Sequence, residues 1–289
     1  MNHPKGASIP VVVENTPVES YMVGDRRVFV KREDKATLSG GPPFSKVRGL
    51  LPHMTKLKES GVTTVGYVET SVSMAGWGVA WCGSKLGMDV VIFDPQYTRN
   101  TLPILLRHRV KWEELGARLV PIPAGRAKIA WYSARRDMPS LCEGKSVLLP
   151  LGIPFPETVE EVAAEWQRTM HIHKPAVAVV NVGSGTICAG LLRGWAPGHG
   201  RIIGVMGRTG NIPLKMASIQ CKAGVLVGGL LGPPLELVDP GWQYTEESKC
   251  DCPFPCHRYY DLKAWQWLVE NLGALPSPIL FWNIGREVE

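Results

Sequence analysis

Short apolar runs alternate along the chain with segments whose apolar residues recur at helical spacing. The runs predict buried strands at Thr63–Val68, Asp89–Phe93, Ala117–Ile122, Ser146–Pro150, Ala176–Val182, Arg201–Met206 and Pro278–Trp282. The helical spacing predicts helices over Ser73–Leu86, Thr101–Leu115, Glu157–Met170 and Ile187–Trp195. Because strands alternate with helices, we expect an α/β fold in which parallel sheets are covered on both faces.

Two segments interrupt this alternation. Pro121–Ser146 is rich in Arg, Gly and Pro and predicts a loop region that closes one βα unit. Leu149–Pro156 contains three prolines and a glycine and predicts a segment that crosses between two domains. A chain of 289 residues is long enough for one large domain or two modest ones.

Composition narrows the class of protein. The hydrophobic fraction of 45% is that of a globular chain with a real core, and no run of about 18 apolar residues suggests a membrane span. Met1–Gly6 lacks the apolar core of a signal peptide, so we expect a cytoplasmic protein. The seven cysteines are then expected to be thiols. A cluster near the C-terminus offers zinc ligands, but it lacks paired C-x-x-C spacing and contains two prolines, so we expect a plain loop and no metal: Cys250, Cys252, Cys256 and His257.

Basic residues are concentrated in one stretch. Between Arg99 and Arg136 there are nine Lys or Arg residues and two acids, Glu113 and Glu114. The ordinary interpretation is a solvated, cationic helix face. The alternative is a surface for an anionic partner such as nucleic acid.

A glycine-rich loop follows one predicted strand and precedes a helix. Gly183-Ser184-Gly185-Thr186 places several N–H groups at a helix N-terminus, where the helix dipole favours an anion such as phosphate. The alternatives are a tight turn without a ligand, or a dinucleotide site. A dinucleotide site needs an acid about 20 residues on. No Asp or Glu lies between Glu165 and Glu236, which leaves only an NADP site that uses Arg208.

Lys46 follows the turn Gly40-Gly41-Pro42-Pro43 and opens a predicted helix. Most lysines are solvated surface groups, and Lys31 and Lys35 lie just before this turn. An amine together with a phosphate cradle is nevertheless what a pyridoxal phosphate enzyme requires.

Several motifs carry a family resemblance over nearly the whole chain. They are Lys31-Arg32-Glu33-Asp34, Ser45-Lys46-Val47-Arg48-Gly49-Leu50, Ser84-Lys85-Leu86-Gly87-Met88, the Gly183–Thr186 loop with Ala189-Gly190, Tyr260-Asp261-Leu262-Lys263, and Ile279–Gly285. The chain resembles the fold-type II pyridoxal phosphate enzymes, the tryptophan synthase beta-like superfamily. Within it, the chain is most similar to the aminocyclopropane-carboxylate deaminase and D-cysteine desulfhydrase branch. Ser45, Met74, Asn283 and Ile284 differ from the residues usual in that branch.

The resemblance implies roles for individual residues. Lys46 would form the Schiff base with the cofactor, and Ser73 would contact the substrate carboxylate or transfer a proton. Met74 stands where the branch has an asparagine, so either Ser71 or another group would replace that contact, or the chemistry would differ from that of the branch. Tyr260 would lie beside the substrate. The cofactor would be bound by Lys46, Asp261 at the pyridine nitrogen, Asn283, and the phosphate loop with the next residue: Gly183, Ser184, Gly185, Thr186 and Ile187.

The resemblance also implies an architecture and an activity. We expect two open parallel-sheet domains with the cofactor in the cleft between them: a large cofactor-binding domain of residues 1–49 and 156–289, and a small inserted domain of residues 50–155. Such enzymes are commonly homodimers. The expected function is that of a pyridoxal phosphate-dependent lyase or deaminase acting at the α- or β-carbon of a small amino acid.

Two alternatives to this function stay open. The basic stretch and the ten tryptophans favour an amino-acid group attached to a larger anion, such as a modified nucleic-acid base, which the enzyme would decarboxylate or cleave by elimination. Met74 and Ile284 favour a non-catalytic binding protein on the same fold.

Overall fold

The computed structural model describes residues 12–37, 40–97, 102–225 and 234–287. The chain divides into two compact units. Among the described residues, unit 1 contains those of 51–151 with short pieces at 12–13, 37 and 40–42, and unit 2 contains those of 14–36, 43–50 and 152–287. The long segment of unit 1 begins within α1 (Val47–Glu59), after Leu50, and ends at Leu151, where the chain returns to unit 2.

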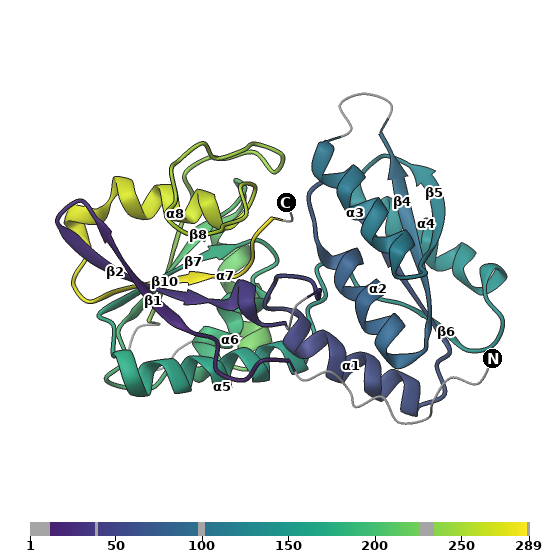
Figure 1. Ribbon diagram of the computed structural model, residues 1–289, viewed down its shortest axis with the longest axis horizontal. Coiled ribbons are helices and arrows are strands. Elements are labelled where there is room, and N and C mark those ends of the chain that lie inside the picture. Colours follow the sequence, from purple (N-terminus) through teal and green to yellow (C-terminus); the bar gives the residue numbers. More distant parts are fainter. Residues whose placement is uncertain (1–11, 38–39, 98–101, 226–233, 288–289) are drawn as a thin grey trace. The chain divides into compact units, whose positions relative to one another are not determined.

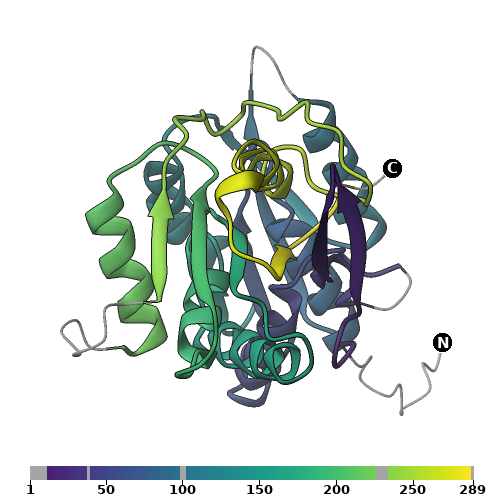
Figure 2. The same ribbon diagram turned by 90° about the vertical axis from the view of Figure 1, so that its left-hand side faces the viewer.

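Unit 2 is built on a six-stranded sheet of order β1-β2-β10-β7-β8-β9 (Figure 1). Its strands are β1 (Val18–Val23), β2 (Arg26–Arg32), β7 (Val177–Val182), β8 (Arg201–Met206), β9 (Leu235–Val238) and β10 (Ile279–Asn283). All neighbouring pairs are parallel except the β1–β2 hairpin. Figure 2 shows the sheet running from light green β9 to the purple hairpin.

Helices cover both faces of this sheet. On one face, α5 (Pro156–His173), α6 (Thr186–Gly194) and α7 (Ile212–Ala223) pack against alternate strand residues such as Val180 and Leu280. On the other face, α8 (Asp261–Glu270) packs against the residues that point the opposite way, such as Val179 and Phe281. Burial on both faces explains why β7 and β10 consist almost entirely of apolar residues. Two short 3-10 helices, Glu33–Lys35 and Leu272–Ala274, complete the unit.

Unit 1 holds a four-stranded parallel sheet of order β5-β4-β3-β6. Its strands are β3 (Thr64–Val68), β4 (Asp89–Gln96), β5 (Arg118–Pro123) and β6 (Ser146–Leu148), and its further helices are α2 (Ala75–Leu86), α3 (Pro103–Glu114) and α4 (Ala127–Leu141). The fold class is therefore α/β with parallel sheets in two domains, as expected. No helix in the described part of the chain combines the length and the hydropathy that a membrane crossing needs.

The seven predicted strands and four predicted helices are confirmed with shifts of up to three residues at their ends. The prediction of a loop region at Pro121–Ser146 is wrong, because most of this segment forms α4. Its apolar residues recur at helical spacing, and Ala134 and Met138 pack on β3 and β4 through Val68 and Phe93. The arginines, which suggested a loop, lie on the solvent-exposed side of the same helix.

Candidate active site

The segment that carries Lys46 is attached to the end of β10. The Ser45 N–H donates to the Ile284 carbonyl at 2.9 Å, and Phe44 forms an antiparallel bridge with Gly285. Lys46 then directly precedes the first residue of α1. A residue that connects a β-bridge to a helix is held on both sides by backbone hydrogen bonds, so the base of its side chain is fixed.

The Lys46 amine lies against the glycine loop. Its Nζ donates to the Gly152 carbonyl at 2.9 Å and to Ser184 Oγ at 3.1 Å. Burial, together with the positive charges of Lys222 and Lys215, lowers the pKa of this amine to about 8. Near pH 8 a large fraction of the amine is therefore neutral and nucleophilic.

Lys31 and Lys35, the alternatives to Lys46, are engaged with carboxylates. Lys31 is completely buried, forms an ion pair with Glu165 and donates to the Thr16 carbonyl at 2.6 Å. Lys35 forms an ion pair with Glu19 at 2.7 Å. Since both amines already bind carboxylates, whereas the Lys46 amine lies against the glycine loop, these contacts favour Lys46 as the nucleophile.

A buried ion pair supports the first turn of α1. Arg48 donates from Nε and from Nη2 to the two Glu33 carboxylate oxygens, both at 2.8 Å, and both residues are buried. Such a bidentate pair fixes geometry as well as charge. It links the Lys-Arg-Glu-Asp motif to the helix that Lys46 precedes. The motif therefore has a structural role, which is to hold the first turn of α1.

The glycine loop has the geometry of an anion cradle. β7 ends at Val182, and α6 begins at Thr186 after Gly185 with φ of +83°, which favours glycine. A Cβ at Gly185 would stand 2.7 Å from the Ile219 side chain. Within the described residues, nothing accepts a hydrogen bond from the Ser184 or Gly185 amide. Two unpartnered N–H groups thus precede a helix N-terminus, where the dipole adds positive potential.

The charges around this loop suit a phosphate dianion. Lys46, Lys215 and Lys222 all approach it, and no acidic residue occurs between Glu165 and Glu236. A group of cations without a neighbouring acid, close to N–H donors that have no acceptor, favours an anionic ligand. The residues present therefore fit the phosphate of the expected cofactor.

Asp261 provides a buried carboxyl group at the start of α8. It is 1% exposed and its Oδ1 accepts the Ile284 N–H at 3.1 Å. Burial, together with the nearby charge of Asp34, raises the pKa of this carboxyl to about 8. Within the described residues no cation forms an ion pair with it. Because Ile284 also accepts the Ser45 N–H, the Asp261 carboxyl lies close to the Lys46 segment and fits a cationic ring nitrogen.

Asn283 and Tyr260 are engaged with protein groups. The Asn283 amide donates to Asp34 Oδ1 at 3.1 Å and to the Pro255 carbonyl at 3.0 Å. The Tyr260 hydroxyl hydrogen-bonds the Tyr244 hydroxyl at 2.8 Å. Both residues lie in unit 2 with Asp261, and their predicted contacts with cofactor and substrate stay predictions.

The predicted substrate residues lie in unit 1, in the loop between β3 and α2. Ser73 Oγ accepts the Ala75 N–H at 3.1 Å, Ser71 is buried, and Met74 stands at the N-cap of α2 without a capping side chain. Their roles stay predictions as well.

Sequence reasoning missed an ionisable residue in this loop. Glu69 is buried and accepts the Thr70 N–H at 2.8 Å and the Gly76 N–H at 2.5 Å. Burial raises the pKa of its carboxyl to about 8. The signal in the sequence was an acid directly after an apolar strand, the usual place for site residues in parallel sheets.

The cysteine cluster does not assemble a metal site in the described residues, where no group of three metal-ligating side chains is found. All seven cysteines are free thiols. Cys256 Sγ donates to Asn283 Oδ1 at 3.5 Å, and Cys250 Sγ to the Asp251 carbonyl at 3.4 Å.

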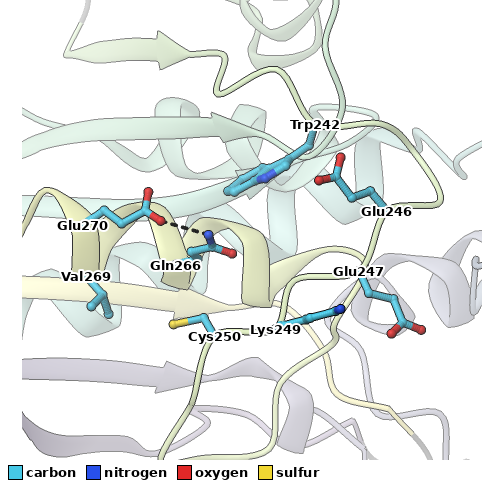
Figure 3. A pocket seen from close by; sticks show the side chains of 8 residues that line it. All are labelled: Trp242, Glu246, Glu247, Lys249, Cys250, Gln266, Val269 and Glu270. Atoms are coloured by element: carbon cyan, nitrogen blue, oxygen red, sulfur yellow. Dashed lines mark hydrogen bonds between the residues drawn. The ribbon is translucent and has the colours of Figure 1, made fainter.

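A separate pocket of about 740 Å³ lies beside α8, and no predicted site residue lines it (Figure 3). Its wall carries three carboxylates, Glu246, Glu247 and Glu270, with the single cation Lys249. Gln266 donates to Glu270, one turn further along α8, at 2.9 Å. An excess of negative charge disfavours a phosphate here, so the phosphate loop is the better candidate site.

Comparisons with known proteins agree with this arrangement. Residues 11–222 match the family described as pyridoxal-phosphate dependent enzyme. The chain is 36% identical over 288 residues to a "Glycyl-dTMP PLP-dependent decarboxylase" of Pseudomonas phage M6, covering 96% of this chain and 100% of that protein.

Among solved structures, the fold matches an ACC deaminase homologue with a TM-score of 0.76 at 19% identity, covering 97% of this chain and 92% of that chain. It matches a hydrogen sulfide-producing enzyme from Fusobacterium nucleatum with a TM-score of 0.67 at 12% identity, covering 97% and 98%. It matches diaminopropionate ammonia lyase from Escherichia coli with a TM-score of 0.62 at 17% identity, covering 95% and 83%.

Proposed function

This chain belongs to the family of pyridoxal-phosphate dependent enzymes, and on that premise we propose that it removes the carboxylate of a glycyl group carried by a thymidine nucleotide. The observation that carries the proposal is the similarity, over nearly the whole chain, to a decarboxylase named for glycyl-dTMP. The fold alone does not select the reaction, because a deaminase homologue and an ammonia lyase share it.

The proposed reaction breaks one bond and forms one. The bond between the α-carbon and the carboxylate breaks, carbon dioxide leaves, and a proton is added to the α-carbon. When bound, pyridoxal phosphate supplies the electron sink for the pair left on the α-carbon.

Lys46 is the residue that we assign to cofactor attachment and proton delivery. With a pKa near 8, a fraction of the amine is neutral and can act as a nucleophile, while the remaining fraction is charged and can donate a proton. Its contacts with Ser184 and Gly152 hold the amine beside the phosphate loop.

Asp261 and the glycine loop are the residues that we assign to the two ends of the cofactor. The Ser184 and Gly185 N–H groups and the start of α6 would hold the phosphate. A cation next to the buried Asp261 carboxyl would lower the pKa of that carboxyl, and the resulting carboxylate would keep a ring nitrogen protonated.

These assignments extend to the two units. We propose that unit 2, which contains Lys46, Asp261 and the Gly183–Thr186 loop, is the large cofactor-binding domain. Unit 1 would be the small domain, and Ser71 and Ser73, which it contains, keep their proposed role in substrate binding.

One observation favours a nucleotide within a polynucleotide over a free nucleotide. The outer face of α4 carries exposed Lys128, Arg135 and Arg136 around Tyr132, which is 65% exposed, and Ile129, which is 62% exposed. Cations bind phosphates, while an exposed aromatic ring stacks on bases. Arg99, where the basic stretch begins, lies outside the described residues.

The test is to supply the cofactor-loaded protein with carboxyl-labelled glycyl-dTMP, as free nucleotide and within an oligonucleotide, and with free glycine. We expect labelled carbon dioxide from a thymidine-linked substrate, none from free glycine, and none from Lys46→Ala. Ammonia release from free amino acids without carbon dioxide would show a deaminase instead. Bound cofactor with no turnover of any substrate would show a binding protein.

A further inference from the structure

Two lysines of α7 hold the carbonyl groups of the phosphate loop. Lys215 Nζ donates to the Gly183 carbonyl at 2.7 Å, and Lys222 Nζ donates to the Ser184 carbonyl at 2.8 Å. The two lysines are seven residues apart, which is about two helical turns, so they share one face of α7. Between them, Ile219 packs against Gly185 and leaves no room for a side chain there.

Because the peptide group is planar, these contacts fix the direction in which the N–H groups of the loop point. In a planar trans peptide, the carbonyl of one residue points opposite to the N–H of the next. A Gly183 carbonyl fixed toward α7 turns the Ser184 N–H away from α7, and a fixed Ser184 carbonyl does the same for the Gly185 N–H. Neither of these two amides has an acceptor within the described residues.

We propose that Lys215 and Lys222 are positioning residues that clamp the loop to α7 and thereby aim the Ser184 and Gly185 N–H groups at the phosphate of the cofactor. The inference rests on the assignment of this loop to the phosphate. The lysines act through the backbone, since each amine already binds a carbonyl. Lys222 is further oriented by Ser218, whose Oγ accepts from Nζ at 2.9 Å.

The clamp also contributes charge. Burial lowers the pKa of Lys215 and of Lys222, and the charges of Arg208 on Lys215 and of Lys215 on Lys222 add to this effect. An anion in the loop relieves the repulsion among these cations, so phosphate binding and clamping support each other.

The experiment compares Lys215→Met, Lys222→Met and the double variant with Arg193→Met as a matched control. Arg193 lies on α6 itself and is ion-paired with Glu160, so its loss removes one cation without touching the loop carbonyls. The affinity of each cofactor-free protein is titrated for pyridoxal phosphate and for pyridoxal, which lacks the phosphate. Lys→Arg variants at both positions test rescue.

We expect each Lys→Met change to weaken pyridoxal phosphate binding by roughly tenfold, the effect of losing a charged hydrogen bond. Pyridoxal binding should stay within about twofold, since it does not use the loop. In the cofactor-free protein, hydrogen exchange at the Ala189 amide, which donates to the Gly185 carbonyl at 2.9 Å, should speed up in the Lys→Met variants. Arg193→Met should change none of these values.

Three outcomes would overturn the clamp. Equal losses for pyridoxal phosphate and pyridoxal would indicate general damage to the fold. Weaker pyridoxal phosphate binding without faster exchange at Ala189 would mean that the lysines contact the phosphate directly. A third outcome is that the double variant binds pyridoxal phosphate normally, while Gly185→Val loses the preference for the phosphorylated form. The assignment of the loop to the phosphate would then stand, and only the clamp would be rejected. If Gly185→Val keeps that preference, the assignment of the loop itself fails.

Discussion

The buried Asp261 carboxyl should make the stability of the cofactor-free protein depend on pH. Its pKa is raised from 3.8 to about 8, chiefly by burial, while the unfolded chain has an ordinary value. Below pH about 4 the carboxyl is protonated in both states. As pH rises from there to about 8, the folded protein keeps a proton that the unfolded chain has released, so rising pH favours unfolding.

The size of the effect follows from the shift. Each pKa unit corresponds to about 1.4 kcal/mol. At pH 7 the Asp261 carboxyl is protonated in the folded protein and ionised in the unfolded chain, and this difference lowers the free energy of unfolding by up to about 4 kcal/mol. Asp261→Asn keeps the shape and removes this cost. We therefore expect the variant to be more stable than the parent protein at pH 7 to 8 (the difference being at least about 1 kcal/mol) and similar to it near pH 4.

The assay is urea unfolding of the cofactor-free proteins at a series of pH values, with Asp25→Asn, in the exposed turn between β1 and β2, as the control. With bound cofactor, a ring cation should lower the pKa of Asp261, so the loss of stability should shrink. Although Asp261→Asn should be more stable than the parent protein, it should be the slower enzyme. We expect its reaction rate to fall by orders of magnitude while its affinity for the cofactor is largely kept. Identical pH slopes for the parent protein and Asp261→Asn would refute the reasoning.

Three further predictions concern the loop, the amine and α4. Gly185→Val should weaken cofactor binding tenfold or more, because it strains φ and contacts α7, whereas Gly183→Ala, with nothing within 4 Å of the added Cβ, should bind almost normally in the same titration. The rate at which Lys46 attaches the cofactor should rise with pH up to about 8, where its amine loses its proton, and then level off; a stopped-flow absorbance series that stays flat would contradict this. Arg135→Glu with Arg136→Glu should weaken binding of single-stranded DNA and flatten its salt dependence, as measured by gel shift, whereas the same reversal at an exposed lysine of α2 should not.

The local sequence was sufficient to locate most elements. Strands such as Arg201–Met206 are continuous apolar runs because both faces of a parallel sheet are buried, and the helices carry one apolar stripe. The hairpin of β1 and β2 was not predicted because β1 is a partly exposed edge strand and β2 buries two charged residues, Lys31 and Arg32, so the apolar pattern is weak in both. The helix α4 was missed because Pro139 lies inside it and Arg135 and Arg136 are exposed on it, and both features are also typical of loops.

By itself, the sequence predicted the α/β fold through its apolar pattern, and its motifs carried the resemblance that implied the family and its cofactor, because patterns and motifs are local properties of the chain. Only the tertiary structure decided which charged groups meet. It separated Lys46 from the carboxylate-paired Lys31 and Lys35, and it brought Lys215 and Lys222 to loop residues that lie 32 and 38 positions earlier in the chain. A pKa or a hydrogen bond depends on neighbours through space, and residue spacing along the chain does not specify them.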